Sequence, residues 1–381
     1  MSRVNVTASG PAPGGAPSAP ARDERLAETG WLHRAMRRPE LGAVGGLIVV
    51  TLFFVFTASS TMFTVAGIMT VLLPASQLGI MAVAAALLMI GGEFDLSIGS
   101  MVAFAGLIFG ELLINLHLPL IVSVLGTLVM AGLFGAINGQ IVLRTRLPSF
   151  IVTLAFLFIL RGLSLVGLKL ASGGNTILSG FRGDSVHADF LTLFSGDAFT
   201  GAFAWMTAHG MIAKLPNGAP SVHGVPVSII WFVLITALAT WVLLKTRFGN
   251  WIFASGGDAN AARNSGVPVD RVKTILFVCT ALTSALVAIL TALDTGSTDA
   301  LRGYQMEFEA IIAAVIGGCL LTGGYGSAVG AFFGALIFGM VSIGLSYTNF
   351  DSDWFQVFLG AMLLIAVMFN NAVRRRVTGE R

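Results

Sequence analysis

Long apolar stretches separated by short polar loops dominate the chain from residue 41 onward. A helix that crosses a bilayer needs roughly 20 mostly apolar residues. About ten stretches meet this criterion, and they run near residues 41–58, 66–90, 97–115, 119–142, 149–169, 226–245, 272–293, 305–321, 326–347 and 354–371. The pattern predicts an all-α polytopic membrane protein with about ten transmembrane helices.

The composition favours the same fold class. Of the 381 residues, 55% are hydrophobic and only 11% are charged, whereas an ordinary soluble domain carries about 25% charged residues. A chain this apolar cannot cover its surface with polar groups, so we expect residues 36–376 to form one transmembrane domain in a lipid bilayer. The basic residues are scattered and form no stripe with interleaved aromatic side chains, which argues against nucleic acid as a partner.

Residues 1–35 differ from the rest of the chain because they are rich in Ala, Pro, Gly and Ser. Such a segment cannot bury enough apolar surface to become ordered. It also lacks the apolar run of about 7–15 residues that a signal peptide contains. We therefore expect a disordered N-terminal tail on the cytoplasmic side.

Basic residues in the loops predict the orientation, because Lys and Arg are enriched in cytoplasmic loops. With an even number of crossings, the basic groups all fall on one face: Arg34, Arg37 and Arg38; Arg144 and Arg146; Lys245, Arg247, Arg263, Arg271 and Lys273; and Arg374, Arg375 and Arg376. Both termini are therefore expected in the cytoplasm.

Residues 171–225 form the one long segment expected on the opposite, periplasmic face. Its apolar stretches, FLTLFSG and GAFAWMTAHGMIA, are short for spanning helices. We interpret them as surface or re-entrant helices. A pair of extra spans is the alternative, and it would leave the orientation of the other helices unchanged.

Residues 246–271 form a cytoplasmic loop that is much longer than a plain helix connection of about 2–8 residues. Asp258 follows a glycine pair and is typical of a helix N-cap, and Gly266 is typical of a C-cap. A short amphipathic helix between them would suit a groove on another protein. The candidate docking residues are Gly257, Asp258, Ala261, Ala262, Arg263 and Gly266. The alternative is a simple loop without a partner.

The stretch GGEFDLSIGS, residues 91–100, places two carboxylates between apolar runs. Asp95 can accept hydrogen bonds from the amides that open the following helix. Non-helical backbone at membrane depth is tolerated only where it is buried in protein or lines a water-filled cavity. The stretch is therefore either a capped helix start or part of a translocation path.

A few other polar residues interrupt apolar stretches. Arg161 lies near the middle of 149–169, where a charge costs at least ~2.5 kcal/mol, so it must face the bundle, a carboxylate or water. Glu307 and Glu309 open 305–321, where they complement the helix dipole or form a gate. The candidates for a translocation path or gate are Gly92, Asp95, Ser97, Asn138, Arg161, Glu307 and Glu309.

The sequence contains no motif for catalysis, nucleotide binding or metal binding. G-x-x-x-x-G-K-[ST], H-E-x-x-H, C-x-x-C and G-x-S-x-G do not occur. We therefore predict no catalytic residues, no metal site and no enzyme activity for this chain.

One internal similarity stands out. IGGEFDLSIGSMVAFAGLIFG, residues 90–110, resembles IGGCLLTGGYGSAVGAFFGALIFG, residues 316–339. Transporters often contain internal repeats, although glycine-rich helices also resemble one another by composition alone.

Five motifs in order carry a family resemblance: GGEFDLSIGSMVAFAG, RLPSFIVTLAFLFILRG, FGNWIFASGGDANAARNSGV, YQMEFEAIIAAVIGGCLLTGGYGS and WFQVFLGAMLLIAV. Over roughly residues 40–376, this set resembles the membrane-spanning permease subunit of ribose-type ABC importers of the bacterial inner membrane, the branched carbohydrate uptake group. The typical signature has one residue between Gly-Gly and Asp, where this chain has Glu93 and Phe94.

The resemblance implies the ABC importer permease fold and the import of a sugar or related small polar solute. It implies cytoplasmic ABC ATPase subunits, a periplasmic substrate-binding protein and a second permease copy as partners. ATP and Mg²⁺ would be held by the ATPase, so no cofactor is expected in this chain. Residues 257–266 match the coupling-helix region that docks on the ATPase.

Two alternatives to an ABC permease remain at this point. An ion- or proton-coupled secondary transporter would need a carboxylate near the membrane midplane, and the predicted spans contain no clear candidate. A membrane scaffold without transport activity would not need a long cytoplasmic docking loop.

Overall fold

The computed structural model describes residues 39–182, 190–351 and 353–378. The predicted tail, residues 1–35, and the basic residues Arg34, Arg37 and Arg38 lie outside this part of the chain. The described residues belong to one compact unit that begins at Pro39.

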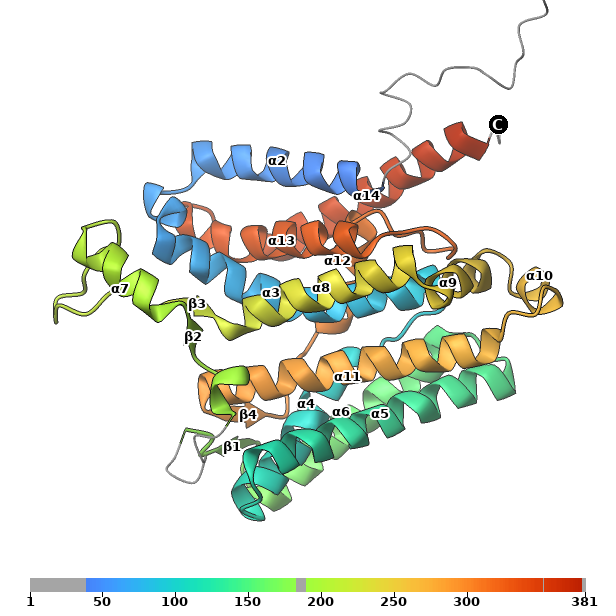
Figure 1. The fold of residues 1–381 in the computed structure, drawn as a ribbon, viewed down its shortest axis with the longest axis horizontal. Coiled ribbons are helices and arrows are strands. Elements are labelled where there is room, and N and C mark those ends of the chain that lie inside the picture. Colours follow the sequence, from blue (N-terminus) through green and yellow to red (C-terminus); the bar gives the residue numbers. More distant parts are fainter. Residues whose placement is uncertain (1–38, 183–189, 352, 379–381) are drawn as a thin grey trace, which may run out of the picture. The chain divides into compact units, whose positions relative to one another are not determined.

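Long and half-length helices form the main bundle of the described residues (Figure 1). They are α2 (Pro39–Thr57), α3 (Val65–Ile90), α4 (Ile98–Gly110), α5 (Leu120–Thr145), α6 (Ser149–Ala171), α8 (Val227–Lys245), α11 (Val269–Thr295), α12 (Met306–Ile316), α13 (Ala328–Gly344) and α14 (Trp354–Thr378). A π-helical turn, η3 (Glu111–Asn115), extends α4. Short 3-10 turns are η2 (Ser60–Phe63) and η5 (Leu345–Tyr347).

Within the described residues, eight helices are long and apolar enough to cross a membrane. The predicted class, an all-α polytopic membrane protein, is confirmed. The predicted span 305–321 is not one helix, however. α12 has eleven residues and is therefore only about 16 Å long, roughly half of a hydrocarbon core of about 30 Å. Residues 317–327 that follow it contain five glycines and no helix.

The centre of the bundle is formed by α3, α4, α11 and α13, whose residues are mostly buried. α3 packs against α8, α11, α12 and α13, and α11 also packs against α4 and α5. Glycine permits the closest approach: a Cβ atom at Gly135 of α5 would lie 2.6 Å from the carbonyl oxygen of Phe277 on α11. Small residues of this kind let helices pack tightly where lipid provides no hydrophobic drive between them.

The outer helices expose large apolar side chains, as expected of surfaces that face lipid. Val49 and Phe56 on α2, Val129 on α5 and Phe158 on α6 are each more than half exposed. Only 28–33% of the residues in the apolar windows of α5, α6 and α8 are buried. These faces are therefore the ones available to the bilayer or to another membrane chain.

One end of the bundle carries the described parts of the segment 171–225, residues 171–182 and 190–225 (Figure 1). Its elements are β1 (Ile177–Ser179), η4 (Leu191–Leu193), β2 (Asp197–Ala198), α7 (Thr200–Ala208) and β3 (Val225–Pro226). β1 pairs antiparallel with β4 (Ser297–Asp299), with Leu178 opposite Thr298, and β2 pairs with β3. The described parts of this segment contain no helix of spanning length.

The opposite end carries α9 (Arg247–Gly257) and α10 (Ala259–Asn264), together with the loops that follow α3, α5 and α12 (Figure 1). The hydroxyl of Ser327 donates to Glu40 Oε1 at 2.8 Å, which brings the start of α2 to the same end. The basic residues that the sequence grouped between residues 144 and 273 all belong to loops or helix ends here. Which side of a membrane this end faces stays a prediction.

Candidate functional site

Two interrupted helices, α3–α4 and α12–α13, form the core of the candidate site, and their breaks have the same backbone geometry. Gly92 and Gly318 occupy the left-handed region with φ of 82° and 90°. The three amides after each helix donate to equivalent carbonyls: Gly91 to Leu87, Gly92 to Met89 and Glu93 to Leu88, and likewise Gly317 to Ala313, Gly318 to Val315 and Cys319 to Ala314. The internal similarity in the sequence is therefore also a similarity in structure at the two helix ends.

The non-helical backbone after α3 is satisfied by side chains of α6. The amide of Phe94 donates to Ser149 Oγ at 3.0 Å, and the amide of Leu96 donates to Thr153 Oγ1 at 3.0 Å. Both side chains are buried. Buried backbone amides need such partners because no water reaches them.

A buried polar network joins the start of α4 to α5 and α11. Asp95 Oδ1 accepts from the amide and the hydroxyl of Ser97 at 2.9 and 2.6 Å. Asp95 Oδ2 accepts from Thr280 Oγ1 at 2.7 Å, and Asn138 Nδ2 donates to Ser97 Oγ at 3.0 Å. All four side chains are at most 5% exposed. The structure thus brings together three predicted path residues, Asp95, Ser97 and Asn138, in a buried hydrogen-bond network that links the start of α4 to α5 and α11.

One of the two interpretations of Asp95 was a cap for the helix that opens the third span. α4 begins at Ile98 and its N-cap is Ser97, whose own side chain makes no capping bond. Asp95 accepts from the Ser97 amide, one residue before the helix. Its second oxygen binds α11, so the carboxylate both orders the turn and links two helices.

The loops after α3 and α12 meet α9 at a glycine cluster, which we define as Gly92, Gly256, Gly323 and Gly324. A Cβ atom at Gly256 would collide with the carbonyl oxygen of Ile90 and lie 2.8 Å from the amide nitrogen of Gly324. A Cβ atom at Gly323 would lie 2.8 Å from both the Gly256 oxygen and the Gly92 Cα. α9 therefore touches both helix breaks by direct backbone contact, which only glycine allows.

The six predicted docking residues lie together in α10 and at its two ends. Asp258 Oδ1 accepts from the amides of Asn260 and Ala261 at 2.9 and 3.0 Å, so it caps the helix as predicted. Gly266 has φ of 83° and ends it. Ala261 and Arg263 point outward and are exposed, whereas Ala262 is 5% exposed and packs inward.

The preceding helix, α9, was not predicted, because its sequence RFGNWIFASGG contains three glycines and glycine is a poor helix former. The available signal was Thr246, whose hydroxyl accepts from the Gly249 amide at 3.1 Å as an N-cap. The segment is therefore a pair of short helices rather than one.

Arg161 lies in a second group of predicted residues, around the loop between β4 and α12. Arg161 Nη1 donates to the carbonyl oxygens of Ala300 and Arg302 at 3.0 and 3.1 Å, and its guanidinium lies 5.9 Å from the ring centroid of Tyr304. Its hydrogen-bond partners are thus backbone carbonyls of a loop, which fixes that loop to α6.

Glu307 lies in the first turn of α12 and is 4% exposed. Its Oε2 atom has no hydrogen-bond partner. A Cβ atom at Gly99 of α4 would collide with this oxygen and lie 2.5 Å from the carbonyl oxygen of Gly303. The starts of α4 and α12 therefore meet, with a carboxylate between them, and Glu309 follows half-buried two residues later.

Comparison with known proteins identifies the family. The family described as "Branched-chain amino acid transport system / permease component" matches residues 67–367. The chain belongs to this family of permease components. No solved structure matches the chain at a significant level.

Curated relatives of this permease cover nearly its whole length. It is 30% identical to the xylose transport system permease protein of Escherichia coli strain K12, over 87% of the permease and 92% of that protein. It is also 30% identical to the ribose import permease protein of the same strain, over 85% and 91%. A xylose permease protein of Haemophilus influenzae is 27% identical.

The permease also contains an ion pair that the sequence did not predict. Lys273 Nζ, in the first turns of α11, lies 2.5 Å from Glu93 Oε1 in the loop after α3. The side chains are only 10% and 14% exposed. Glu93 had no assigned role because the two residues are 180 positions apart, and no spacing rule connects them.

The described residues of the permease contain no group of three or more His, Cys, Asp or Glu side chains that could hold a metal ion. The two cysteines, Cys279 and Cys319, lie within or next to the bundle helices.

Proposed function

We propose that this permease forms the membrane path of an ABC importer for a sugar, and that it is driven by a separate ATPase that docks on α9 and α10. The observation that carries the proposal is the glycine cluster, because it joins the docking helices directly to both interrupted helices. The family membership favours an importer permease over an ion-coupled secondary transporter.

The substrate class is supported by the relatives named for xylose and for ribose, which are similar to this permease over most of its length. Both named substrates are pentoses. We therefore propose a monosaccharide or a similar small polyhydroxylated solute.

A route for coupling follows from the contacts around α9. α9 follows α8 after one residue, and its last turn packs against Gly92 and Gly324 through backbone atoms. A displacement of α9–α10 by an ATPase would therefore reach the α3–α4 and α12–α13 breaks without an intervening flexible side chain. The buried network around Asp95 would then carry the displacement to α5 and α11.

The remaining partners follow from the same proposal. The end that carries α10 would face the cytoplasm, and the segment 171–225 would face a periplasmic substrate-binding protein. The half-exposed apolar faces of α5, α6 and α8 would contact lipid or a second permease copy in the bacterial inner membrane. ATP and Mg²⁺ would be bound by the ATPase.

The coupling proposal is tested with Ala261→Arg, which adds a bulky cation on the exposed side of α10 without touching the buried Ala262. We expect co-purification of the ATPase with the permease to be lost, and uptake by reconstituted vesicles to fall at least tenfold. A hot-spot residue near the centre of a protein interface contributes about 2 kcal/mol or more.

The matched control is Ala208→Arg, which adds the same side chain at an exposed position of α7 at the other end of the bundle. This variant should keep the ATPase bound. Full ATPase binding and uptake by the Ala261→Arg variant would refute docking at α10.

A further inference from the structure

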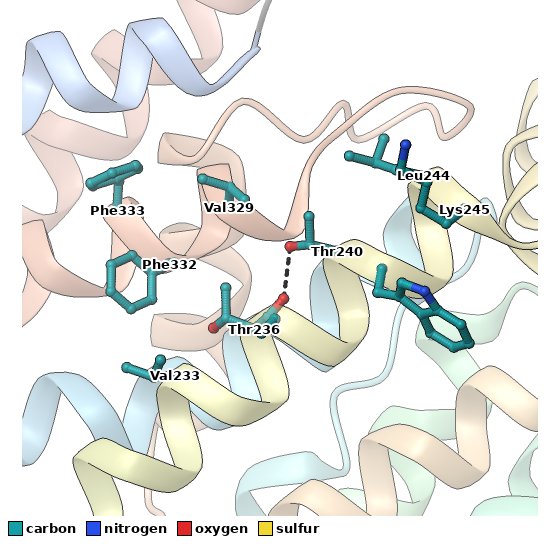
Figure 2. A pocket seen from close by; sticks show the side chains of 10 residues that line it. Val233, Thr236, Thr240, Leu244, Lys245, Val329, Phe332 and Phe333 are labelled. Carbon is teal, nitrogen blue, oxygen red and sulfur yellow. Dashed lines mark hydrogen bonds between the residues drawn. The ribbon is translucent and has the colours of Figure 1, made fainter.

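An apolar groove of about 560 Å³ runs along the surface between α8 and α13. It lies outside the candidate site and plays no part in the proposed function. Figure 2 shows Val233, Thr236 and Thr240 of α8 in a row, facing Val329, Phe332 and Phe333 of α13. Ala237, Trp241 and Leu244 complete the apolar lining, and Lys245 lies at one end.

The threonines do not make this groove polar, because their hydroxyl groups are already bonded to their own helix. Thr240 Oγ1 donates to the carbonyl oxygen of Thr236 at 2.7 Å (Figure 2), and Thr236 Oγ1 donates to that of Phe232 at 2.8 Å. The side chains therefore offer their methyl groups to an occupant. An occupant of the groove must be apolar over most of its length.

The floor of the groove is preformed. The ring of Phe332 stacks on the buried ring of Phe232 with centroids 4.5 Å apart, and Phe333 packs edge-on against Phe332 at 5.5 Å. A Cβ atom at Gly79 of α3 would collide with Phe232. The backbone of α3 therefore packs directly against the ring of Phe232 and supports the aromatic stack. A rigid apolar surface binds an occupant at low entropic cost.

The length and charge of the groove match one leaflet of a bilayer. Residues 233–245 rise about 18 Å along α8, close to half of a hydrocarbon core of about 30 Å. Lys245 is the last residue of α8, and Arg247 begins α9, so two cationic groups stand at the C-terminal end of α8. Lys245 is exposed, and neither residue belongs to an ion pair among the described residues.

We infer that this groove binds an anionic phospholipid, with an acyl chain along α8 and α13 and the phosphate at Lys245 and Arg247. A basic site between membrane helices is a common way to hold an anionic head group. The charge at the end of the groove is the reason to favour a lipid over a second permease copy, which would bring the same cations to the contact.

The test uses the full permease purified in mild detergent and native mass spectrometry to count bound lipids. Phosphatidylglycerol and phosphatidylcholine with identical acyl chains are compared. We expect retention of phosphatidylglycerol at about fivefold lower concentration than phosphatidylcholine, and Lys245→Gln should remove most of this preference. Ala237→Trp fills the groove and should abolish retention of either lipid.

Two matched controls separate the groove from the rest of the surface. Lys169→Gln removes a lysine from the last turn of α6, and Ala155→Trp adds an indole to an exposed position of α6. Both should bind phosphatidylglycerol like the unchanged permease. Unchanged lipid retention in the Lys245→Gln and Ala237→Trp variants would overturn the inference. So would efficient disulfide formation between two copies carrying Ala237→Cys, since the groove would then be an interface between permeases. Because lipid retention is measured without an ATPase or a substrate, the result does not depend on the proposed transport function.

Discussion

Single residues at the breaks in the helices show how a mostly apolar chain positions its few charges. Glu93 and Lys273 form a nearly buried ion pair that ties the loop after α3 to α11. Removing one partner of such a pair leaves an unpaired charge in a low-dielectric environment, whereas replacing both removes the desolvation cost as well. The change in stability caused by a substitution therefore depends on whether it leaves an unpaired buried charge.

This difference gives a prediction for stability. Lys273→Met leaves Glu93 without its partner and should lower the free energy of unfolding by at most roughly 3–5 kcal/mol. Combining it with Glu93→Leu should recover most of that loss. The free energy of unfolding of both variants is measured in the same bilayer mimic by titration with a denaturing detergent.

Arg263→Gln is the control for the ion-pair prediction, because it breaks the exposed pair with Asp270, whose atoms are 2.7 Å apart. An exposed pair contributes about 0–1 kcal/mol, so this variant should change stability little. A double variant that is no more stable than Lys273→Met alone would contradict the proposed role of the buried pair.

At the scale of elements, the glycine cluster makes α9 part of the bundle rather than a loose connection. Contact between Gly256 and the backbone of Ile90 and Gly324 leaves no room for a side chain. At the adjacent Gly257, a Cβ atom would have no neighbouring atom within 4 Å, and this residue lies at the end of the same helix. Substitutions at Gly256 and at Gly257 therefore distinguish the effect of close packing from the effect of helix propensity.

Gly256→Ala should destabilise the permease by about 1–3 kcal/mol, as overpacking of a tight contact does. Gly257→Ala should be neutral or stabilise by up to roughly 1 kcal/mol, since alanine loses less backbone entropy in a helix than glycine. Measuring the free energy of unfolding of each variant tests these two expectations. Equal effects of the two substitutions would show that α9 does not rest on the helix breaks in the folded protein.

At the scale of the whole molecule, the bundle has two chemically different ends. One carries α10 and most of the basic residues between 144 and 273. The other carries α7, the two small sheets and the loop held by Arg161 (Figure 1). An asymmetric distribution of Lys and Arg is what orients a membrane protein during insertion.

The orientation prediction is checked by labelling in intact cells. Cysteines introduced by Asn260→Cys in α10 and Ala204→Cys in α7 occupy exposed positions at opposite ends. A membrane-impermeant thiol reagent added outside should label Ala204→Cys after the outer membrane is opened, and should reach Asn260→Cys only after lysis. The reverse pattern would invert the topology and remove the proposed ATPase from its docking helix.

The amino-acid sequence by itself determined the class of the protein and most of its helices. Apolar runs of spanning length and the near absence of charge leave a membrane bundle as the only stable arrangement. The caps of α10 were also readable, because Asp258 and Gly266 act on backbone groups a few residues away. The family resemblance added the permease assignment, which the matched relatives support.

Tertiary structure alone decided the features that depend on distant partners. The sequence could not separate the half-length α12 from a span, because its apolar run continues through Gly317, which packs against the backbone of Gly330 and Ala331 on α13. The sequence chose Asp95, Ser97 and Asn138 as path residues, which stays a prediction, but it could not show that they share one buried network in which Asp95 binds Thr280 of α11. The pairing of Glu93 with Lys273 and the groove between α8 and α13 depend on which helices become neighbours. The local sequence pattern indicates the structural propensity of each segment but does not indicate which other segment will pack against it.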